Sequence, residues 1–238
     1  MNFHEYNLKR LTAAILAVML CCAAVFMTAC SVPKNIDSES TELSIPAYSG
    51  EPYAVINNNV PFFTEEEKQA GTFESYSELD YLGRCGVAYA NVTRELMPTG
   101  KRGKIGDIKP TGWRQRKYPG LINTDPPYLY NRSHLIAYCL TAENANEKNL
   151  ITGTRYMNET GMKPFEDQTA RYLDTHDNHV LYRATPIFEG DNLLASGVLI
   201  EAFSVEDNGA GICFCVYCYN VQPGVEIDYS TGQNWLAE

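Results

Sequence analysis

Apolar residues in the C-terminal third of the chain gather in three runs with strand character. The runs are 179–188 (HVLYRATPIF), 193–203 (LLASGVLIEAF) and 212–221 (ICFCVYCYNV), and all are rich in β-branched or aromatic residues. An Asp-Asn-Gly sequence at 207–209 is a turn signal between the last two runs. The pattern predicts successive antiparallel strands.

The earlier part of the mature chain mixes short strand signals with one helical pattern. Residues 53–60 (YAVINNNV) predict a short strand that ends in an Asn-rich turn, 76–90 predict a turn that leads into a strand, and 128–131 (YLYN) predict another strand. Apolar residues take helical spacing over 165–173, after an irregular stretch that begins at Leu150. These mixed elements, followed by antiparallel strands, predict an α+β fold rather than a doubly wound sheet.

The first 30 residues have the pattern of an export signal. A basic pair precedes an almost unbroken apolar run from Leu11 to Met27, which is the length of a signal core and short for a membrane span. The run closes on Met-Thr-Ala before Cys30, which resembles a bacterial lipoprotein cleavage box. That resemblance implies that residues 1–29 are removed and that Cys30 is lipidated. The alternative is an ordinary secretory signal that is cleaved nearby.

The domain organisation follows from this signal and from a change in composition. Residues 31–50 are rich in Ser, Glu and Pro, so 30–50 are expected to be a lipidated Cys and a flexible tether. Residues 51–238 then form one folded domain, which is long enough to bury its own core. We expect an exported protein that is either anchored at the cell surface through Cys30 or secreted.

Charge is unevenly distributed along the chain. The net charge is −10 overall, but residues 101–117 hold seven Lys or Arg against one Asp. A solvated loop is one interpretation of this basic stretch, and a surface that contacts phosphates is the other. Trp113 lies within the stretch, where it either packs against the fold or stacks on a base.

The cysteines leave several interpretations open. Three of the eight lie at or before Cys30, and an odd number remains in the domain: Cys85, Cys139, Cys213, Cys215 and Cys218. An exported protein can form disulfides, but sequence does not give their pairing. The three cysteines at 213–218 follow a C-x-C-x-x-C spacing that suggests a metal site. They lie in an apolar strand pattern, however, which favours structural thiols or a disulfide.

Four features in the middle of the chain suggest chemistry when they are taken together. They are the sequence Asn131-Arg132-Ser133-His134, then Asn149, Asn158 and Glu166. Taken singly, each has an ordinary structural interpretation, because a lone His after a strand is usually a hydrogen-bonding residue. A lone Asn in a polar loop usually caps a helix or forms a turn.

The segments NRSHLIAY and NEKNLITGTRYMNETGMKPFE resemble the DNA/RNA non-specific endonucleases of the ββα-metal, or His-Me finger, class. The similarity is greatest to secreted and DNA-entry nucleases of Gram-positive bacteria and runs from about residue 52 to 230. It implies a ββα-metal finger core on a mainly antiparallel sheet. It also implies hydrolysis of DNA and RNA without sequence preference, leaving 5′-phosphate ends.

The resemblance assigns roles to residues that match the family motif. His134 is implied to be the general base, and Asn158, 24 positions later, the only protein ligand of Mg²⁺, with Mn²⁺ as a substitute. Glu166, eight positions beyond Asn158, is implied to orient water around the metal. Arg132 is implied to lie near the phosphate. A neutral His accepts a proton at physiological pH, and Mg²⁺ keeps most of its water, so it needs few protein ligands.

Substrate contacts are expected from Arg102, which matches a family Arg upstream of the motif, and from Asn131 and Asn149. Asn149 is also a rival for the metal ligand, although its spacing from His134 is short. The motif departs from the usual Asp-Arg-Gly-His because it has Asn131 and Ser133, which we interpret as a subfamily variant. No module that reads base sequence is recognisable, in agreement with non-specific cleavage.

The expected partners are DNA, RNA and a membrane that holds the lipid anchor, and no protein partner is predicted. The main alternative is a surface lipoprotein on the same fold that binds nucleic acid without cutting it. A second alternative is a zinc-dependent hydrolase that uses the C-terminal cysteines. Arg183 also lies within the region of resemblance, either in a structural ion pair or in contact with substrate.

Overall fold

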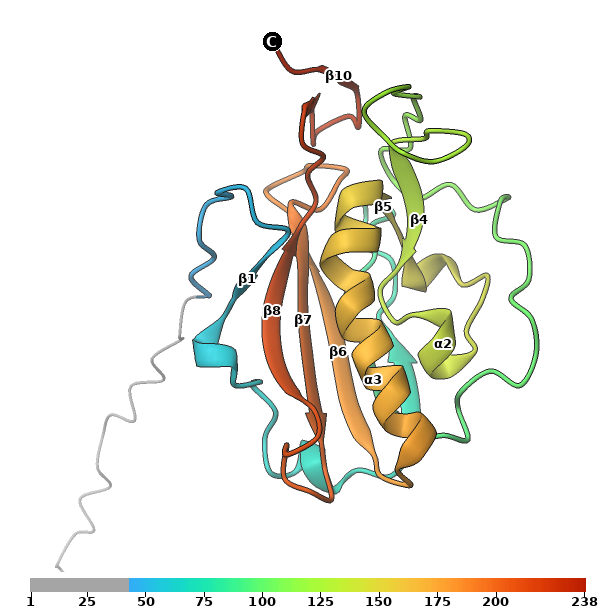
Figure 1. Ribbon diagram of the computed structural model, residues 1–238, viewed down its shortest axis with the longest axis vertical. Helices are drawn as coiled ribbons and strands as arrows, with labels where there is room; N and C mark the ends of the chain where they lie inside the picture. The colour runs from blue at the N-terminus through green and yellow to red at the C-terminus, as the bar shows by residue number, and fades with distance from the viewer. Residues whose placement is uncertain (1–42) are drawn as a thin grey trace, which may run out of the picture. The chain divides into compact units, whose positions relative to one another are not determined.

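A six-stranded antiparallel sheet forms the centre of the computed structural model, which describes residues 43–238 (Figure 1). Its strand order is β1-β8-β7-β6-β3-β2, and every neighbouring pair is antiparallel. The strands are β1 (Tyr53–Val55), β2 (Phe73–Tyr76), β3 (Ala88–Val92), β6 (Val180–Ile187), β7 (Gly197–Ser204) and β8 (Cys213–Tyr219). The three predicted C-terminal strands are therefore confirmed, and they pair in succession.

A second layer lies over one face of this sheet (Figure 1). It consists of a two-stranded hairpin, β4 (Tyr130–His134) with β5 (Leu150–Thr154), followed by the π-helical turn η4 (Met157–Met162) and the helix α3 (Lys163–Thr175). Together these elements have the ββα order that the family resemblance implies. The predicted strand at 128–131 extends through the motif to His134. The irregular stretch after Leu150 contains a strand that the sequence pattern did not show.

Smaller elements connect the two layers. They are η1 (Asn57–Asn59), η2 (Glu67–Gln69), α2 (Tyr138–Thr141), η3 (Glu147–Asn149), β9 (Val225–Ile227) and β10 (Asn234–Leu236). The Asn-rich turn predicted after the first strand is η1, whose three residues all have positive φ, at 49°, 52° and 67°. Asn tolerates this left-handed region better than most residues do. None of the helices within residues 43–238 is long and apolar enough to cross a membrane.

The main core lies between the sheet and α3. Alternate residues of β6 to β8 point toward the helix, and Leu173, Met157 and Met162 meet them from the other side with no exposed surface. Each such side chain contributes roughly 1.5–3 kcal/mol through burial. This packing fixes the helix relative to the sheet, and so it also fixes the cleft residues that the helix carries.

The opposite face of the sheet holds Arg183 in a buried ion pair. Arg183 Nε lies 2.8 Å from Oε2 of Glu201, which is 2% exposed, and Arg183 Nη1 lies 2.9 Å from Oε1 of Glu67. The guanidinium also lies 4.7 Å from the ring centroid of Phe63. Of the two interpretations of Arg183, the structure shows the ion pair.

The three C-terminal cysteines all lie on strand β8. Cys213 and Cys215 are two residues apart and share a face of the strand, whereas Cys218 points to the other face. All five cysteines between residues 43 and 238 are free thiols. No group of three or more His, Cys, Asp and Glu within that range has the geometry to hold a metal ion.

Of the segments predicted at the N-terminus, the structure describes only residues 43–50. Residues 1–29, Cys30 and most of the expected tether lie outside the described residues. The compact unit begins at Ser44. Within it, the hydroxyl of Tyr219 donates to the carbonyl of Pro46 at 2.7 Å, and Tyr48 packs edge-on against Tyr219. Residues 44–50 therefore contact the domain, whereas the sequence assigned them to the tether.

Candidate active site

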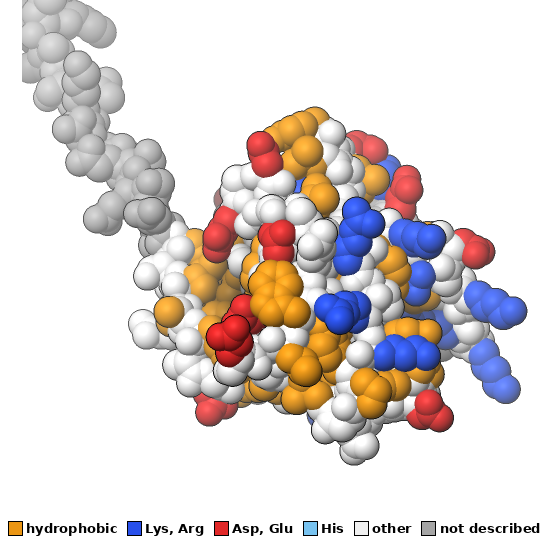
Figure 2. Space-filling view, turned by 90° about the horizontal axis from the view of Figure 1, so that it is seen from above, with side chains coloured by type: hydrophobic (Ala, Val, Ile, Leu, Met, Phe, Trp, Pro, Cys, Tyr) orange, Lys and Arg blue, Asp and Glu red, His pale blue; other side chains and the backbone are white. Residues whose placement is uncertain are grey.

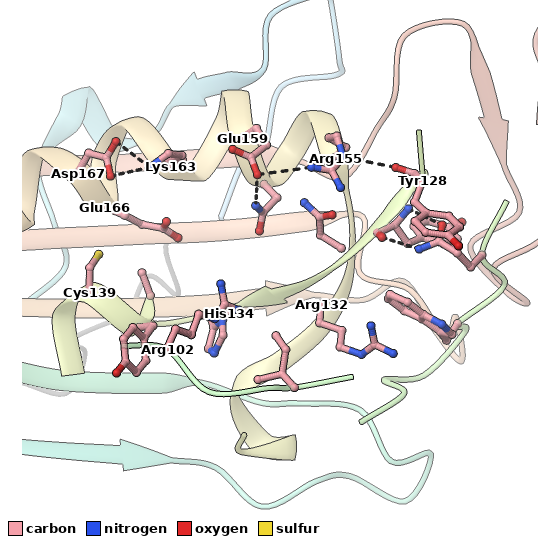
Figure 3. Close-up of a pocket in the computed structure, with 18 residues that line it drawn as sticks. Arg102, Tyr128, Arg132, His134, Cys139, Arg155, Glu159, Lys163, Glu166 and Asp167 are labelled. Atoms are coloured by element: carbon pink, nitrogen blue, oxygen red, sulfur yellow. Dashed lines mark hydrogen bonds and ion pairs between the residues drawn. The ribbon is translucent and has the colours of Figure 1, made fainter. Parts of the chain in front are cut away.

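A cleft of about 940 Å³ lies between the β4–β5 hairpin, the basic stretch and the start of the helix (Figure 3). His134 and Arg132 reach it from β4, and Arg102 reaches it from the basic stretch. Glu159 and Glu166 reach it from η4 and α3 on the other side. The cleft thus brings basic groups from the strand side to face carboxyl groups from the helix side.

His134 ends β4 and lies against the cleft with 6% of its surface exposed. Its Nδ1 lies 3.1 Å from Nη2 of Arg102, and its Nε2 lies 2.9 Å from the carbonyl oxygen of Asn144. A guanidinium only donates and a carbonyl only accepts, so Nδ1 is the acceptor and Nε2 carries the hydrogen. These two contacts select one neutral tautomer, whose basic nitrogen faces Arg102.

The surroundings of His134 keep its imidazole neutral. The pKa of His134 is lowered to about 4, chiefly by burial; Arg102 adds to the lowering, and the hydrogen bond to the carbonyl of Asn144 opposes it. The ring is therefore ready to accept a proton at pH 7. An anion in the cleft would raise this pKa, because negative charge favours the imidazolium.

Asn158 occupies the π-helical turn that follows β5. The hydroxyl of Thr154, at the end of that strand, accepts a hydrogen bond from the backbone nitrogen of Met157 at 3.0 Å and so ties the first residue of the turn to the strand. Asn158 is half-buried and lines the cleft. Its Nδ2 donates to Oε1 of Glu159 at 3.3 Å. Its Oδ1 accepts no hydrogen bond from the described residues, which leaves an amide oxygen available at the cleft.

Glu166 projects from α3 into the same cleft and is half-buried (Figure 3). Burial raises the pKa of Glu166 to about 8, and the positive charge of Lys163 opposes the shift. Lys163 lies 2.9 Å from Oδ1 of Asp167, so its charge is largely directed to that carboxylate. Glu166 is consequently a carboxyl group that lacks a close cation of its own among the described residues.

Arg132 has the same strand orientation as His134 but is held by the basic stretch. Its Nη2 donates to the carbonyl of Gly106 at 2.6 Å, and its Nε donates to the carbonyl of Ile108. Its guanidinium lies 4.4 Å from the ring centroid of Trp113. Trp113 packs against the small cluster of apolar residues around Tyr130. Of the two interpretations of this tryptophan, the structure therefore shows packing against the fold.

The two motif positions that depart from the family pattern differ in location. Asn131 is half-buried and lines the cleft. Ser133 is fully buried and faces away from it. A Cβ placed on Gly153 of the neighbouring strand would collide with the side chains of Ser133 and Met157. The serine therefore fits inside the protein because Gly153 leaves room for it.

Asn149 does not line the cleft, so the structure does not agree with the substrate contact that was expected of it. Its side chain is fully buried. Its Oδ1 accepts from the backbone nitrogen of Ile136 at 2.9 Å, and its Nδ2 donates to the carbonyl oxygen of the same residue, also at 2.9 Å. Both polar atoms are used in fixing the segment after His134, so Asn149 has a structural position.

The cleft gathers the other residues predicted to act in catalysis, metal binding or substrate contact, and several that the sequence analysis missed. The predicted residues are Arg102, Asn131, Arg132, His134, Asn158 and Glu166. Those missed include Gln115, Arg155, Glu159 and Lys163. An i,i+4 charge pattern on the helix was the available signal for the last three, since Arg155 pairs with Glu159 and Lys163 with Asp167.

Comparison with known families supports the resemblance found in the sequence. A family model described as DNA/RNA non-specific endonuclease matches residues 64–205, more than half of the chain. A curated deoxyribonuclease from Streptococcus dysgalactiae subsp. equisimilis is 27% identical over 208 residues, which covers 71% of this chain. The match covers 62% of that relative, so the chain spans less than two thirds of its length.

Solved structures share the fold. NucA from Streptococcus agalactiae with magnesium bound matches with a TM-score of 0.70 and 23% identity, over 82% of this chain and 91% of that one. The Sda1 nuclease with bound zinc matches with a TM-score of 0.66 and 24% identity, over 79% and 97% of the two chains. The predicted α+β fold with a mainly antiparallel sheet is confirmed.

Proposed function

The chain belongs to the DNA/RNA non-specific endonuclease family, an enzyme family that hydrolyses nucleic acids, and on this premise we propose how it does so. The reaction is hydrolysis of phosphodiester bonds in DNA and RNA at the cleft around His134. It uses Mg²⁺, which Mn²⁺ can replace, and leaves 5′-phosphate ends. The observation that carries the proposal is the fixed neutral tautomer of His134, whose Nδ1 lies against Arg102 in a cleft that Asn158 also lines.

The donor set of the cleft fits a hard divalent cation. Asn158 offers a free amide oxygen, and Glu159 and Glu166 offer carboxyl oxygens nearby. These are the ligands that Mg²⁺ and Mn²⁺ prefer. Cys139 also lines the cleft, but burial raises the pKa of its thiol to about 11, which keeps it protonated and a poor ligand. One relative was crystallised with magnesium and another with zinc, which supports a divalent cation here.

We assign Asn158 as the direct protein ligand and Glu166 as the group that orients the surrounding water. When bound, the cation supplies positive charge to the phosphate oxygens and to the departing oxygen. A neutral amide ligand leaves that charge undiminished for the substrate. The half-buried carboxyl of Glu166, which has no close cation among the described residues, is the second group of the cleft whose ionised form a bound cation would stabilise.

His134 acts as the general base at Nδ1. Nδ1 takes a proton from water while the water oxygen bonds to phosphorus and the bond to the 3′ oxygen breaks, and that oxygen leaves with the bonding electron pair and takes a proton from solvent to become the 3′ hydroxyl. The hydrogen bond from Nε2 to Asn144 keeps the ring oriented and stabilises the imidazolium. Arg102 covers Nδ1 in this structure, so it must turn toward the phosphate before the base is free. Arg132 and Asn131 position the phosphate from β4.

The proposal is tested by cleavage of plasmid DNA and total RNA with Mg²⁺ or with EDTA. The wild-type protein, His134→Ala and Asn158→Ala are compared. Product ends are identified by ligation, because ends with a 5′ phosphate are joined by ligase and lose this ability after treatment with phosphatase. Metal-dependent cleavage of both substrates, lost in both variants, is expected. Absence of cleavage by well-folded wild-type protein would refute the enzyme and favour the surface lipoprotein that only binds nucleic acid.

We also propose that the protein is exported and anchored through a lipid on Cys30. The pattern of residues 1–30 supports this, and two structural relatives are described as an extracellular endonuclease and an extracellular nuclease. In a bacterial host, Cys30→Ala is expected to move the nuclease from the membrane fraction to the medium. If the wild-type protein is already found in the medium, the proposed lipid anchor is wrong, and the alternative of an ordinary secretory signal is favoured.

A further inference from the structure

A second hollow of about 370 Å³ adjoins the cleft and takes no part in the chemistry above. It is lined by Arg114, Gln115, Arg116, Gln233, Asn234 and Trp235. Gln115 lines both the hollow and the cleft, and its amide makes two hydrogen bonds to the backbone of Tyr130, at 2.6 and 2.9 Å. The hollow is therefore fixed to the first residue of the strand that carries His134.

The position of the hollow sets a distance from the reacting phosphate. Its lining includes two residues of the β9–β10 hairpin, Asn234 and Trp235, and Gln115 joins it to Tyr130, at the opposite end of β4 from His134. Four residues of extended strand span roughly 13 Å. That length is the axial rise of about four nucleotides of a B-form strand. A nucleic acid cut at His134 would reach the hollow at least about four nucleotides from the cut.

The seven Lys and Arg of the basic stretch 101–117 form no ion pair with the described residues. Among residues 43–238, seven of the nine Lys and Arg outside 101–117 lie within 4 Å of a carboxylate. None of the seven inside 101–117 does so. Figure 2 shows Lys and Arg gathered on one side of the molecule in this view. Uncompensated cations on an otherwise acidic protein attract a polyanion.

The hollow also presents an aromatic ring to solvent. Trp235 is 44% exposed, and its Nε1 donates to Oε2 of Glu226 at 2.7 Å, which fixes the ring on the hairpin. Arg116 donates to the carbonyl of Asn234 at 2.6 Å, and so ties the hairpin to the basic stretch. A fixed exposed ring beside guanidinium groups that have no carboxylate partner among the described residues is the arrangement with which single-stranded nucleic acid is held through stacked bases and phosphates.

We propose that this hollow binds the substrate strand at a subsite remote from the cut, with Arg114 on a phosphate and Trp235 under a base. The inference rests on the proposed function, because continuity with the cleft is what makes nucleic acid the occupant. Stacking and phosphate contacts are independent of base identity, so the subsite adds affinity without sequence preference. It should act only on substrates long enough to reach it.

Two variants test the subsite. Arg114→Gln removes a side chain that makes no hydrogen bond within the described residues, and Trp235→Ala removes the ring. Trp235→Phe keeps a stacking surface, and Arg171→Gln is the matched control because it removes an exposed, unpaired cation elsewhere. Each is assayed on a single strand of about 30 nucleotides and on bis(p-nitrophenyl) phosphate, with thermal denaturation as a check of folding.

For the long strand, Trp235→Ala is expected to raise KM about fivefold or more with kcat unchanged, and Trp235→Phe to restore most of the affinity. Arg114→Gln should reduce the slope of log(kcat/KM) against log salt by about 0.7. The small diester should be cut equally by all variants. Unchanged KM and salt slope on the long strand would overturn the proposal.

A binding measurement separates this proposal from the proposed function. The chain has two tryptophans, so Trp113→Phe leaves Trp235 as the only reporter. Stacking on a base should quench its fluorescence when the strand is added in EDTA, where no cleavage is expected. Quenching in this variant, with no activity of the wild-type protein in Mg²⁺, would refute the proposed nuclease activity and keep the subsite. Activity without quenching would refute the subsite alone.

Discussion

The structure places two asparagines differently, so substitution by alanine should affect a different property of the protein at each position. Asn149 is fully buried and makes two hydrogen bonds of 2.9 Å to the backbone of Ile136. Asn158 is half-buried and makes one hydrogen bond of 3.3 Å to Glu159. Asn149→Ala should therefore reduce stability, and Asn158→Ala should reduce activity.

The expected loss of stability can be worked out from these contacts. Two net hydrogen bonds contribute about 1–3 kcal/mol, and Ile136, itself fully buried, is left with unpaired backbone groups that cost more. We expect Asn149→Ala to lower the free energy of unfolding by about 3 kcal/mol. In a domain of this size that corresponds to a fall in Tm of roughly 6–12 °C. Asn158→Ala should stay within about 0.5 kcal/mol of the wild type.

The assay is urea unfolding of both variants at pH 7, beside plasmid cleavage in Mg²⁺ at a temperature where both remain folded. Asn158→Ala should lose at least about 100-fold in kcat/KM, because it loses the proposed direct ligand. Asn149→Ala should keep most of its kcat/KM under these conditions. A stable, inactive Asn149→Ala together with a fully active Asn158→Ala would show that the metal assignment is reversed.

Three further predictions follow from buried groups. His134 has a pKa of about 4 in the folded state against 6.5 in the unfolded state, so the unfolded chain binds more protons between these values. Stability should fall by up to about 3 kcal/mol as the pH drops from 6.5 to 4, and urea titrations should show a smaller fall in His134→Gln. Gly153→Ala should cost about 1–3 kcal/mol in urea unfolding through collision with Ser133 and Met157, whereas Gly100→Ala, with open space around it, should be neutral. Arg183→Met should lower the unfolding free energy by about 3–5 kcal/mol by leaving Glu201 buried without its main cation, and adding Glu201→Leu should recover much of that loss in a double-mutant cycle.

The sequence was most informative where local pattern and tertiary packing agree. Strands β6, β7 and β8 are long, are rich in β-branched and aromatic residues, and pair with their neighbours in sequence, so each run of residues predicts its strand directly. The helix begins two residues before the predicted 165–173 and ends two after it. The short strand β5 (Leu150–Thr154) was missed because all five of its residues are buried, which removes the alternation that marks a half-exposed strand.

Features that depend on contacts between distant segments could not be predicted from residue types. The hydrogen-bond partner that orients His134 is the backbone carbonyl of Asn144, and every residue has such a carbonyl. Asn149 and Asn158 both lie in polar contexts, and only the folded structure shows that one is buried. Gln115 has no distinguishing sequence context, although it joins the cleft to the second hollow.

The two departures from the family motif, Asn131 and Ser133, differ in their effect on the cleft. Ser133 faces the interior and is accommodated by Gly153, so its hydroxyl adds nothing to the surface that meets the substrate. Asn131 lines the cleft, where the usual Asp would place a negative charge. A carboxylate there would raise the pKa of His134 and attract a cation, because both effects follow from added negative charge. The asparagine therefore leaves His134 a weaker base, and leaves Asn158 on the helix side as the proposed ligand of the metal, with Glu166 proposed to orient its water.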